Sequence, residues 1–249
     1  MPPAGVNLFE VQQLRLTEVA APQLSPEEEA ARDRAWEKAV QANPDLFDGP
    51  VVACAGVDWE EPGRLVLSWA RVTYRHYALR RVPGNTSWLP SLFVNVVQPT
   101  TDGRVLAVRM SSSTAAPGRW QLPGGSVEPP EAQSGGLDEA ALRGHAAREL
   151  AEETGVVLPA EELRLWVVTC GENRSIGLAF LAPPRLASVL HERFEAVTVT
   201  ERARGRDPEL ERIALVGSTA ELANLEGPHA DYLEPIVGRY TRTPLRRDG

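Results

Sequence analysis

The first ninety residues alternate between apolar and polar positions, a pattern that predicts strands separated by turns. Residues 8–19 alternate in part and are typical of a strand. Residues 46–81 contain apolar, β-branched runs that are interrupted at Asp48-Gly49-Pro50 and at Glu61-Pro62-Gly63. Such a pattern is expected for antiparallel strands joined by turns.

One helix is predicted inside this region, after residue 24. Ser25 and Glu28 form a capping box, in which each side chain accepts a hydrogen bond from the other residue's backbone N–H. Pro26 suits the first helical position, because the N–H that proline lacks has no partner there. Pro44 marks the end of the helix.

The rest of the chain mixes strand and helix patterns. Residues 92–110 give two strands around Asp102-Gly103, which is a strong hairpin signal. Residues 163–170 and 175–183 form another strand pair around the loop GENR. Later patterns predict helices at 184–196 and 226–240, with a strand at 212–218 between them. Intermixed strands and helices indicate an α/β architecture with one mixed sheet between helical layers.

Residues 148–155, RELAEETG, place one arginine and three glutamates on one face of a predicted helix. Successive helical side chains turn by about 100°, so Arg148, Glu149, Glu152 and Glu153 share one arc. Like charges at this spacing repel each other by roughly a few tenths of a kcal/mol per pair. A bound cation would offset the repulsion; the alternative is a charged face exposed to water.

The residues around this helix favour the cation. Gly155 is well placed to cap the helix in the left-handed conformation. Upstream, the adjacent Gly124 and Gly125 let the backbone turn sharply and approach a ligand, and Glu128 and Glu131 follow. A glycine turn leading to clustered carboxylates is a plausible cage of oxygen ligands for Mg²⁺ or Mn²⁺.

Gly125–Glu131 and Arg148–Val156 resemble the two halves of the Nudix hydrolase signature. In that pattern seven residues separate the first glutamate from the arginine, whereas sixteen do so here. The family's first glutamate pairs with the motif arginine, and either Glu131 or Glu139 could take that role. Glu139 lies two and a half helical turns before Arg148, too far for a direct pair, so we prefer Glu131.

The resemblance implies an α/β fold of the Nudix type: an α/β/α sandwich with a mixed β-sheet, plus an N-terminal β-rich extension. We expect residues 1–90 to form the extension, with strands and one helix, and residues 91–249 to form the Nudix hydrolase domain. Three further stretches resemble the UDP-glucose pyrophosphatase branch of the family. They are residues 43–56 with 73–81, residues 122–130 followed by an insertion, and GENRS at 171–175.

The resemblance also implies an activity, namely hydrolysis of the diphosphate bridge of a nucleoside diphosphate linked to another group. A UDP-sugar such as UDP-glucose, giving UMP and a sugar 1-phosphate, is the expected substrate. Divalent cations, Mg²⁺ or Mn²⁺, activate water and neutralise phosphoryl oxygens in such reactions. Two alternatives stay open: the same chemistry on ADP-ribose, a dinucleotide or a nucleoside triphosphate, and a regulatory module that binds a nucleotide without cleaving it.

Each residue of the motif then has an expected role. Glu152 and Glu153 are the main metal ligands, and Glu149 is a third ligand or orients the attacking water. Gly124 offers a backbone carbonyl to the same metal, as the family resemblance implies. Arg148 holds the carboxylates in place by charge-assisted hydrogen bonds.

Other candidates lie outside the motif. Glu209 or Glu211 could supply a late-loop acid that serves as base or ligand, although exposed surface charges are the commoner explanation. His145 shares a helical face with Glu149 but is more often a surface residue in such a position. For the nucleotide, an aromatic ring can stack on uracil and an arginine can hold phosphate. The substrate-binding candidates are Tyr74, Arg75, Asn173 and Arg174.

Bulk composition narrows the setting. The chain has 249 residues, a net charge of −8 and a pI near 5.2, so it advertises no basic face for a nucleic acid polymer. Its two cysteines form no CxxC pair, which favours a reducing, cytoplasmic location. No secretory signal pattern and no apolar run of transmembrane length is present, so no membrane partner is expected. A homodimer is kept as an option.

Overall fold

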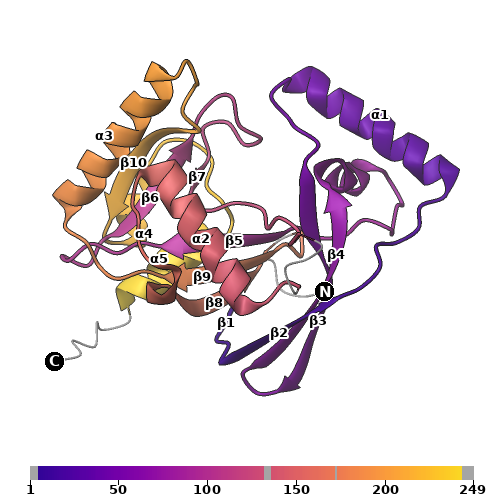
Figure 1. Ribbon diagram of the computed structural model, residues 1–249, viewed down its shortest axis with the longest axis horizontal. Coiled ribbons are helices and arrows are strands. Elements are labelled where there is room, and N and C mark those ends of the chain that lie inside the picture. The colour runs from indigo at the N-terminus through magenta and orange to yellow at the C-terminus, as the bar shows by residue number, and fades with distance from the viewer. Residues whose placement is uncertain (1–4, 132–135, 172, 243–249) are drawn as a thin grey trace.

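The computed structural model describes residues 5–131, 136–171 and 173–242. The chain forms two regions, the N-terminal extension and a larger region that carries the motif (Figure 1). Glu172 of the GENR loop and residues 132–135 of the insertion lie outside the described residues. The extension contains β1 (Asn7–Phe9), β2 (Gln13–Glu18), α1 (Pro26–Ala42), β3 (Pro50–Glu61), β4 (Arg64–Thr73) and the 3-10 helix η1 (Tyr74–Arg81).

Helix α1 begins where the sequence predicted. The Glu28 N–H donates to Ser25 Oγ at 3.3 Å, and the Ser25 N–H donates to Glu28 Oε2 at 2.9 Å, so the capping box is confirmed. Glu28 Oε1 also accepts from Ser87 Oγ at 2.6 Å. The cap therefore ties the start of α1 to the loop that leads into the second region.

The β3–β4 hairpin is confirmed, with its turn at Pro62-Gly63. The expectation that residues 74–81 continue as strand is wrong, because they form η1. Asp48 Oδ1 accepts the Arg75 N–H at 2.8 Å, and buried contacts of Leu79 anchor the turn from inside. Residues 8–19 also divide, since β1 pairs with β8 of the second region and β2 pairs in parallel with β4.

The second region mixes short strands with longer helices. Its strands are β5 (Leu92–Val97), β6 (Val105–Met110), β7 (Trp120–Gln121), β8 (Arg164–Cys170), β9 (Ile176–Leu181) and β10 (Leu210–Val216). Its helices are α2 (Glu139–Thr154), η2 (Ala160–Glu162), α3 (Ala187–Ala203), α4 (Thr219–Ala223) and α5 (Leu233–Arg242).

The strands form three sheets, ordered β1-β8-β9-β5, β10-β6-β7 and β2-β4-β3, where a single mixed sheet was expected. The α/β class is confirmed, and two of the sheets contain both parallel and antiparallel pairs. The hairpin predicted at 92–110 closes only at its turn, where Pro99 faces Val105. Beyond that turn β5 pairs with β9 and β6 pairs with β10, because the two strands diverge into separate sheets.

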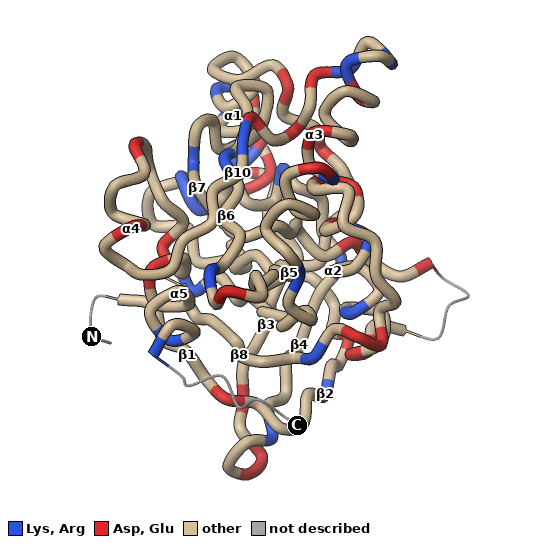
Figure 2. The backbone as a smooth tube through the Cα atoms, turned by 90° about the vertical axis from the view of Figure 1, so that its left-hand side faces the viewer, with Lys and Arg blue, Asp and Glu red and all other residues tan. Residues whose placement is uncertain are grey.

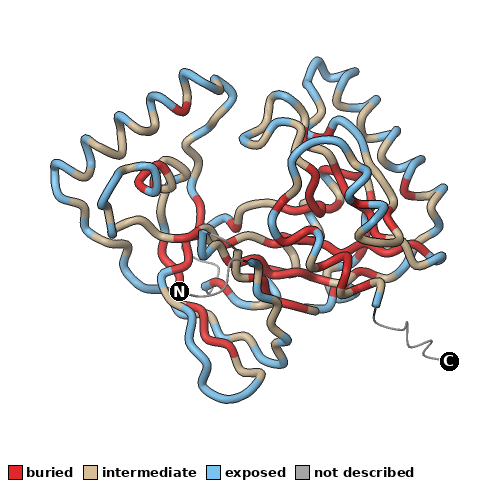
Figure 3. Tube along the Cα trace, turned by 180° about the vertical axis from the view of Figure 1, so that it is seen from behind, coloured by how far each residue is buried: buried red, intermediate tan, exposed pale blue. Residues whose placement is uncertain are grey.

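One apolar core runs across the boundary between extension and second region. Leu67 and Trp69 of β4 pack in the same buried cluster as Val94 of β5 and Leu150 of α2. Figure 3 shows the buried segments concentrated in the strands, while α1 and α3 are largely exposed. The extension is thus seated on the second region through apolar contacts, which are the main source of stabilisation in such packing.

Charges of both signs are distributed over the chain. In Figure 2 segments of Asp and Glu alternate with segments of Lys and Arg. None of the helices in the described ranges combines the length and apolarity needed to span a bilayer.

Candidate active site

Helix α2 is positioned by caps at both ends. Asp138 Oδ1 accepts the Ala141 N–H at 2.7 Å, and Gly155 ends the helix in the predicted left-handed conformation with φ 71°. The Gly155 N–H donates to Ala151 O at 2.9 Å. Buried Leu142 and Leu150 fix the apolar face against the core, so the acidic face is held in one orientation.

The glycine turn lies directly against two of the helical carboxylates. Glu153 Oε2 accepts the Gly124 N–H at 2.8 Å, and only 6% of the Glu153 residue is exposed. A Cβ added to Gly125 would lie 2.7 Å from Glu149 Oε2, so a side chain there would push the Glu149 carboxylate out of its present position. The prediction that this turn and this helix face form one site is therefore supported by direct contacts.

The site concentrates negative charge. Burial raises the pKa of Glu153 well above its usual range, and the charges of Glu209, Glu149 and Glu152 raise it further, although the Gly124 N–H opposes this. A buried carboxylate among other carboxylates is strongly destabilised in its charged form. This arrangement of hard oxygen donors fits a hard divalent cation.

The cage is not preformed around a cation. Within the ranges that the structure describes, no three His, Cys, Asp or Glu side chains are close enough together to hold a metal ion as they are placed. Glu152 is exposed and Glu149 is partly exposed. For the three carboxylates to share one cation, the exposed Glu152 side chain would have to turn toward Glu149 and Glu153.

Arg148 contacts residues other than the helical carboxylates. Its Nη2 lies 3.2 Å from Glu128 Oε2 and 2.9 Å from His145 Nδ1. Glu128 was not among the partners considered from the sequence. Glu139 instead pairs with Arg143 one turn later, at 2.5 Å, as helical spacing requires.

His145 connects Arg148 to the acidic face. His145 is buried, whereas such a histidine was expected at the surface. Its Nε2 lies 2.9 Å from Glu149 Oε1, but the geometry is not that of a regular hydrogen bond. A guanidinium only donates, so Nδ1 accepts from Arg148 and a neutral imidazole carries its proton on Nε2, facing Glu149. His145 is thus a buried contact of Glu149, whereas the sequence had favoured a surface position.

A cleft of about 790 Å³ adjoins the glycine turn. It is lined by the extension, by strands and loops of the second region, and by late loops. Representative residues are Tyr74, Tyr77, Arg80, Trp88, Phe93, Asn95, Arg119, Gly124, Gly125, Asn173, Glu209 and Tyr232. Aromatic rings, arginines and the glycine turn therefore share one concave surface, as ligand sites usually do.

Two of the four predicted substrate-binding residues line this cleft and two do not. Tyr74 and Asn173 line it, and Tyr74 packs edge-on against Tyr77 with ring centroids 5.5 Å apart. Arg75 does not line it, and its guanidinium pairs with Asp48 at 3.0 Å and with Asp33 at 3.5 Å.

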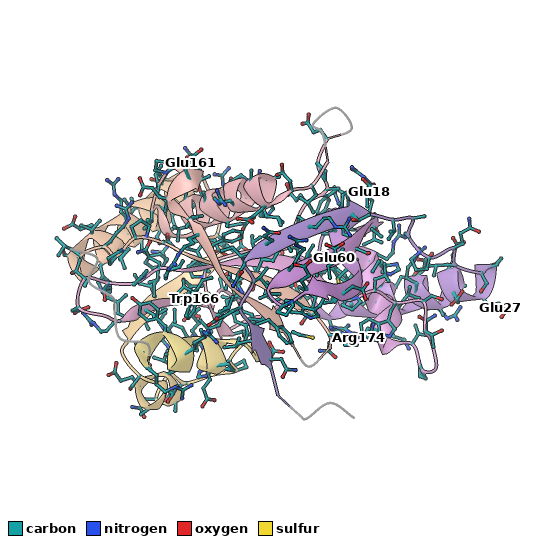
Figure 4. All side chains as sticks on the ribbon, turned by 90° about the horizontal axis from the view of Figure 1, so that it is seen from below. Glu18, Glu27, Glu60, Glu161, Trp166 and Arg174 are labelled. Carbon is teal, nitrogen blue, oxygen red and sulfur yellow. The ribbon has the colours of Figure 1, made fainter. Side chains whose placement is uncertain are left out.

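Arg174 is also absent from the cleft lining. Its guanidinium lies over the Trp88 ring, 5.7 Å from the ring centroid. Figure 4 places it near the junction of the extension with the second region. Arg174 therefore supports Trp88, which does line the cleft, by a cation–π contact.

The two late-loop acids separate clearly. Glu211 accepts two hydrogen bonds from Arg109 Nη1, at 2.7 and 2.8 Å, and is neutralised there. Glu209 lines the cleft and is exposed to solvent. Partial desolvation by the surrounding protein raises its pKa, and the charges of Glu149 and Glu152 raise it further. Glu209 is therefore the late-loop acid that the site can use.

We expect Glu209→Gln to lower the hydrolysis rate by about a hundredfold, the size typical of losing one acid–base or charge-stabilising group. The matched control is Glu211→Gln, which removes the same charge two residues away, outside the cleft, and should leave the rate within about threefold of wild type. Steady-state kinetics on both variants make the comparison. Equal losses in the two variants would show that Glu209 has no special role.

Several cleft residues were not identified from the sequence. Arg119 and Arg80 belong to a linker and to η1, and Tyr232 precedes α5, so no local pattern distinguished them from surface residues. The glycine turn, Tyr74, Asn173 and Glu209 were the residues of this surface that had been named from the sequence.

The family comparison agrees with this geometry. Residues 91–233, more than half of the chain, match the NUDIX domain. The chain belongs to the NUDIX domain family, and this membership supports pyrophosphohydrolase activity. The match begins where the sequence placed the end of the extension, although the extension as a separate domain stays a proposal.

Solved structures give weaker likenesses. The MutT protein from Methanosarcina mazei Go1 is 22% identical over 61% of this chain and 94% of its own, with a TM-score of 0.40. NrtR from Shewanella oneidensis, complexed with a 27mer DNA, is 19% identical over 61% and 60%, with a TM-score of 0.38. A bifunctional NMN adenylyltransferase/ADP ribose pyrophosphatase from Francisella tularensis, complexed with AMP and a Mn ion, is 14% identical over 64% and 42%, with a TM-score of 0.37.

The comparison with curated proteins gave no match. The expectations that this chain avoids nucleic acid polymers and membranes, and that it is cytoplasmic, therefore stay predictions. A homodimer likewise stays an option.

Proposed function

We propose that this protein is a metal-dependent NUDIX hydrolase that cleaves the diphosphate bridge of a nucleoside diphosphate linked to another group. The observation that carries the proposal is the contact of the glycine turn with buried Glu153 and with Glu149 at the edge of the cleft. Three carboxylates that repel one another are not needed by a module that only binds nucleotides. They suit an enzyme that requires Mg²⁺ or Mn²⁺.

The residues take distinct roles in this proposal. Glu152 and Glu153 would hold the cation, with Glu149 as third ligand or as orienter of the attacking water and the Gly124 carbonyl as a further donor. The cation, when bound, supplies charge neutralisation at the phosphoryl oxygens and a lower pKa for water. His145 holds Glu149, whose carboxylate would otherwise be free to rotate.

Arg148 acts one step further away. Its contact with His145 fixes the imidazole tautomer, and its contact with Glu128 fixes the guanidinium. The expected role of Arg148 in holding the carboxylates is thus proposed to run through His145.

For the substrate we propose a UDP-sugar such as UDP-glucose, with UMP and a sugar 1-phosphate as products. The support comes from the resemblance of residues 43–56, 73–81 and 122–130 to the UDP-glucose pyrophosphatase branch, and from a cleft large enough for both ends of such a molecule. Tyr74 and Asn173 remain proposed contacts for the nucleotide. ADP-ribose is the second candidate, because the motif handles the diphosphate and does not read its substituents.

A panel of UDP-glucose, ADP-ribose, a dinucleoside polyphosphate and UTP, each with Mg²⁺ or Mn²⁺, tests the proposal by product mass. We expect UMP and glucose 1-phosphate to appear fastest, and no product in EDTA. Faster cleavage of ADP-ribose would keep the enzyme class and reject the UDP-sugar. Binding without cleavage of any member would establish the non-catalytic alternative.

A further inference from the structure

The cleft contains two arginines whose charges are not neutralised by neighbouring carboxylates. We propose that Arg119 and Arg80 form an anion-binding subsite for a phosphoryl group of the substrate, an inference that rests on the hydrolase function proposed above. The subsite joins the NUDIX domain, which supplies Arg119, to the extension, which supplies Arg80.

Arg119 is fixed in the cleft by a neutral partner. Its Nη2 donates to Gln121 Oε1 at 2.8 Å, while its Nε is buried and has no hydrogen-bond partner. No carboxylate within the described ranges lies within ion-pair distance of Arg119. A partly buried charge without a counter-ion is unfavourable, so such a group is expected where an anion binds.

Arg119 shares the cleft lining with tyrosines from two distant parts of the chain. Burial raises the pKa of Tyr74 and of Tyr232, and Arg119 is the largest of the positive charges that oppose this rise at each hydroxyl. Tyr74 belongs to the extension and Tyr232 to a late loop, and both line the cleft. Arg119 thus shares one concave surface with a residue of the extension and a residue of a late loop.

Arg80 reaches the same surface from η1. It is exposed, it lines the cleft, and it makes no ion pair or hydrogen bond with any residue in the described ranges. Arg119, Arg80 and Arg81 all lower the pKa of Tyr74 against the effect of burial. Arg119, Arg80 and Tyr74 line the same cleft, whereas Arg81 is not part of its lining.

Two other arginines near the cleft are neutralised by carboxylates. Arg75, five residues before Arg80, pairs with Asp48 at 3.0 Å. Arg109, on the strand beside β7, is bound by both carboxylate oxygens of Glu211. Arg80 and Arg119 are the two arginines in the cleft lining, and neither has a carboxylate partner within the described ranges.

The chemistry selects a phosphoryl group as ligand. A guanidinium presents planar, parallel N–H donors that match phosphate oxygens, and it stays charged at all relevant pH values. The carboxylates of Glu149, Glu153 and Glu209 repel a phosphoryl group placed beside them unless a cation is bound there, whereas the arginines attract one without a cation. Arg119 and Arg80 would therefore hold one phosphoryl group while the metal-dependent part of the site acts on the other.

Binding in EDTA separates this subsite from catalysis. Isothermal titration of the full chain with UDP and with inorganic pyrophosphate, neither of which needs to be hydrolysed, measures the subsite directly. We expect Arg119→Gln to weaken both ligands by about tenfold or more, as loss of a charge-assisted hydrogen bond does. Arg80→Gln should weaken them less, because its side chain is exposed and mobile side chains contribute less.

Two further variants serve as controls for the binding experiment. Arg119→Lys keeps the charge but loses the planar donors, so it should bind with intermediate affinity. Arg202→Gln removes an exposed arginine from α3 and should bind as wild type does. Because Arg119 has no carboxylate partner, Arg119→Gln is expected to melt no lower than wild type, which shows that lost affinity is not lost folding.

The outcomes distinguish the two proposals. Unchanged affinity in Arg119→Gln, or no measurable binding of either ligand by wild type, would overturn the subsite even if the protein hydrolyses UDP-glucose. Tenfold weaker binding in Arg119→Gln would support the subsite even if no substrate in the panel were cleaved.

Discussion

Glu153→Gln is expected to lose hydrolysis by at least about a thousandfold and yet to make the metal-free protein more stable. The activity falls because an amide is a poor ligand for a hard divalent cation, and removal of a key group at such sites lowers rates by orders of magnitude. The stability rises because a buried carboxylate beside Glu149 and Glu209 is replaced by a neutral group. The amide oxygen can still accept the Gly124 N–H, so the turn keeps its contact.

The raised pKa of Glu153 determines how the stability of the folded protein changes with pH. Burial raises the pKa of Glu153 in the folded protein above its unfolded value near 4.5. The folded protein therefore holds this proton more tightly, and its stability falls as pH rises from about 4.5 through the folded pKa. Glu153→Gln has no such proton, so its advantage over wild type should grow between pH 5 and 8, reaching on the order of 1–2 kcal/mol.

Thermal melts in EDTA at several pH values, with kinetics in Mg²⁺, measure both effects. Glu161→Gln, at a side chain that projects from the surface in Figure 4, is the control and should change neither quantity. A Glu153→Gln protein that melts lower than wild type in EDTA would show that the carboxylate stabilises the fold instead of serving the site. Retained activity would remove Glu153 from the proposed ligands.

Gly124→Ala is expected to destabilise the fold by about 3–5 kcal/mol and to abolish activity. Gly124 has φ 147°, which a residue with a side chain rarely adopts, and a Cβ there would lie 2.1 Å from the Val94 carbonyl oxygen. The obstacle is backbone, so it cannot move aside as a flexible side chain could. The turn must shift, and with it the hydrogen bond to Glu153.

Gly144→Ala is the matched control for that substitution. Gly144 lies inside α2, and an added Cβ meets nothing within 4 Å, so alanine should stabilise the helix by about 0.5–1 kcal/mol. Chemical denaturation of both variants compares the two glycines. If Gly124→Ala proved as stable as Gly144→Ala, the close approach of the turn to β5 would be contradicted.

Local signals predicted the local structure well. The capping box of Ser25 and Glu28, the Pro62-Gly63 turn and the Gly155 cap all depend on residues close in sequence, and all three are confirmed. Two features that depend on contacts between residues distant in sequence were not predicted correctly. Residues 74–81 form η1, because Asp48 accepts the Arg75 N–H and buried side chains such as Leu79 hold the helix. Strand β5 pairs with β9 and not with its predicted hairpin partner β6.

The candidate site divides in the same way. The acidic helix and the glycine turn belong to one continuous pattern, so Glu149, Glu153 and Gly124 could be named from sequence alone. Glu209 could be named but not chosen over Glu211, because the choice depends on whether Arg109 is near. No local sequence pattern identified Arg119 as a site residue. It lines a cleft together with Tyr74 and Tyr232, which are distant from it in sequence.

The central claim is that the carboxylates of α2, beside the glycine turn, hold a divalent cation. Electron paramagnetic resonance titration of the metal-free chain with Mn²⁺ tests it most directly, with Glu153→Gln and Glu211→Gln measured alongside. We predict saturable Mn²⁺ binding by wild type and by Glu211→Gln, and binding at least about tenfold weaker in Glu153→Gln. Equal Mn²⁺ affinity in wild type and Glu153→Gln would contradict the account.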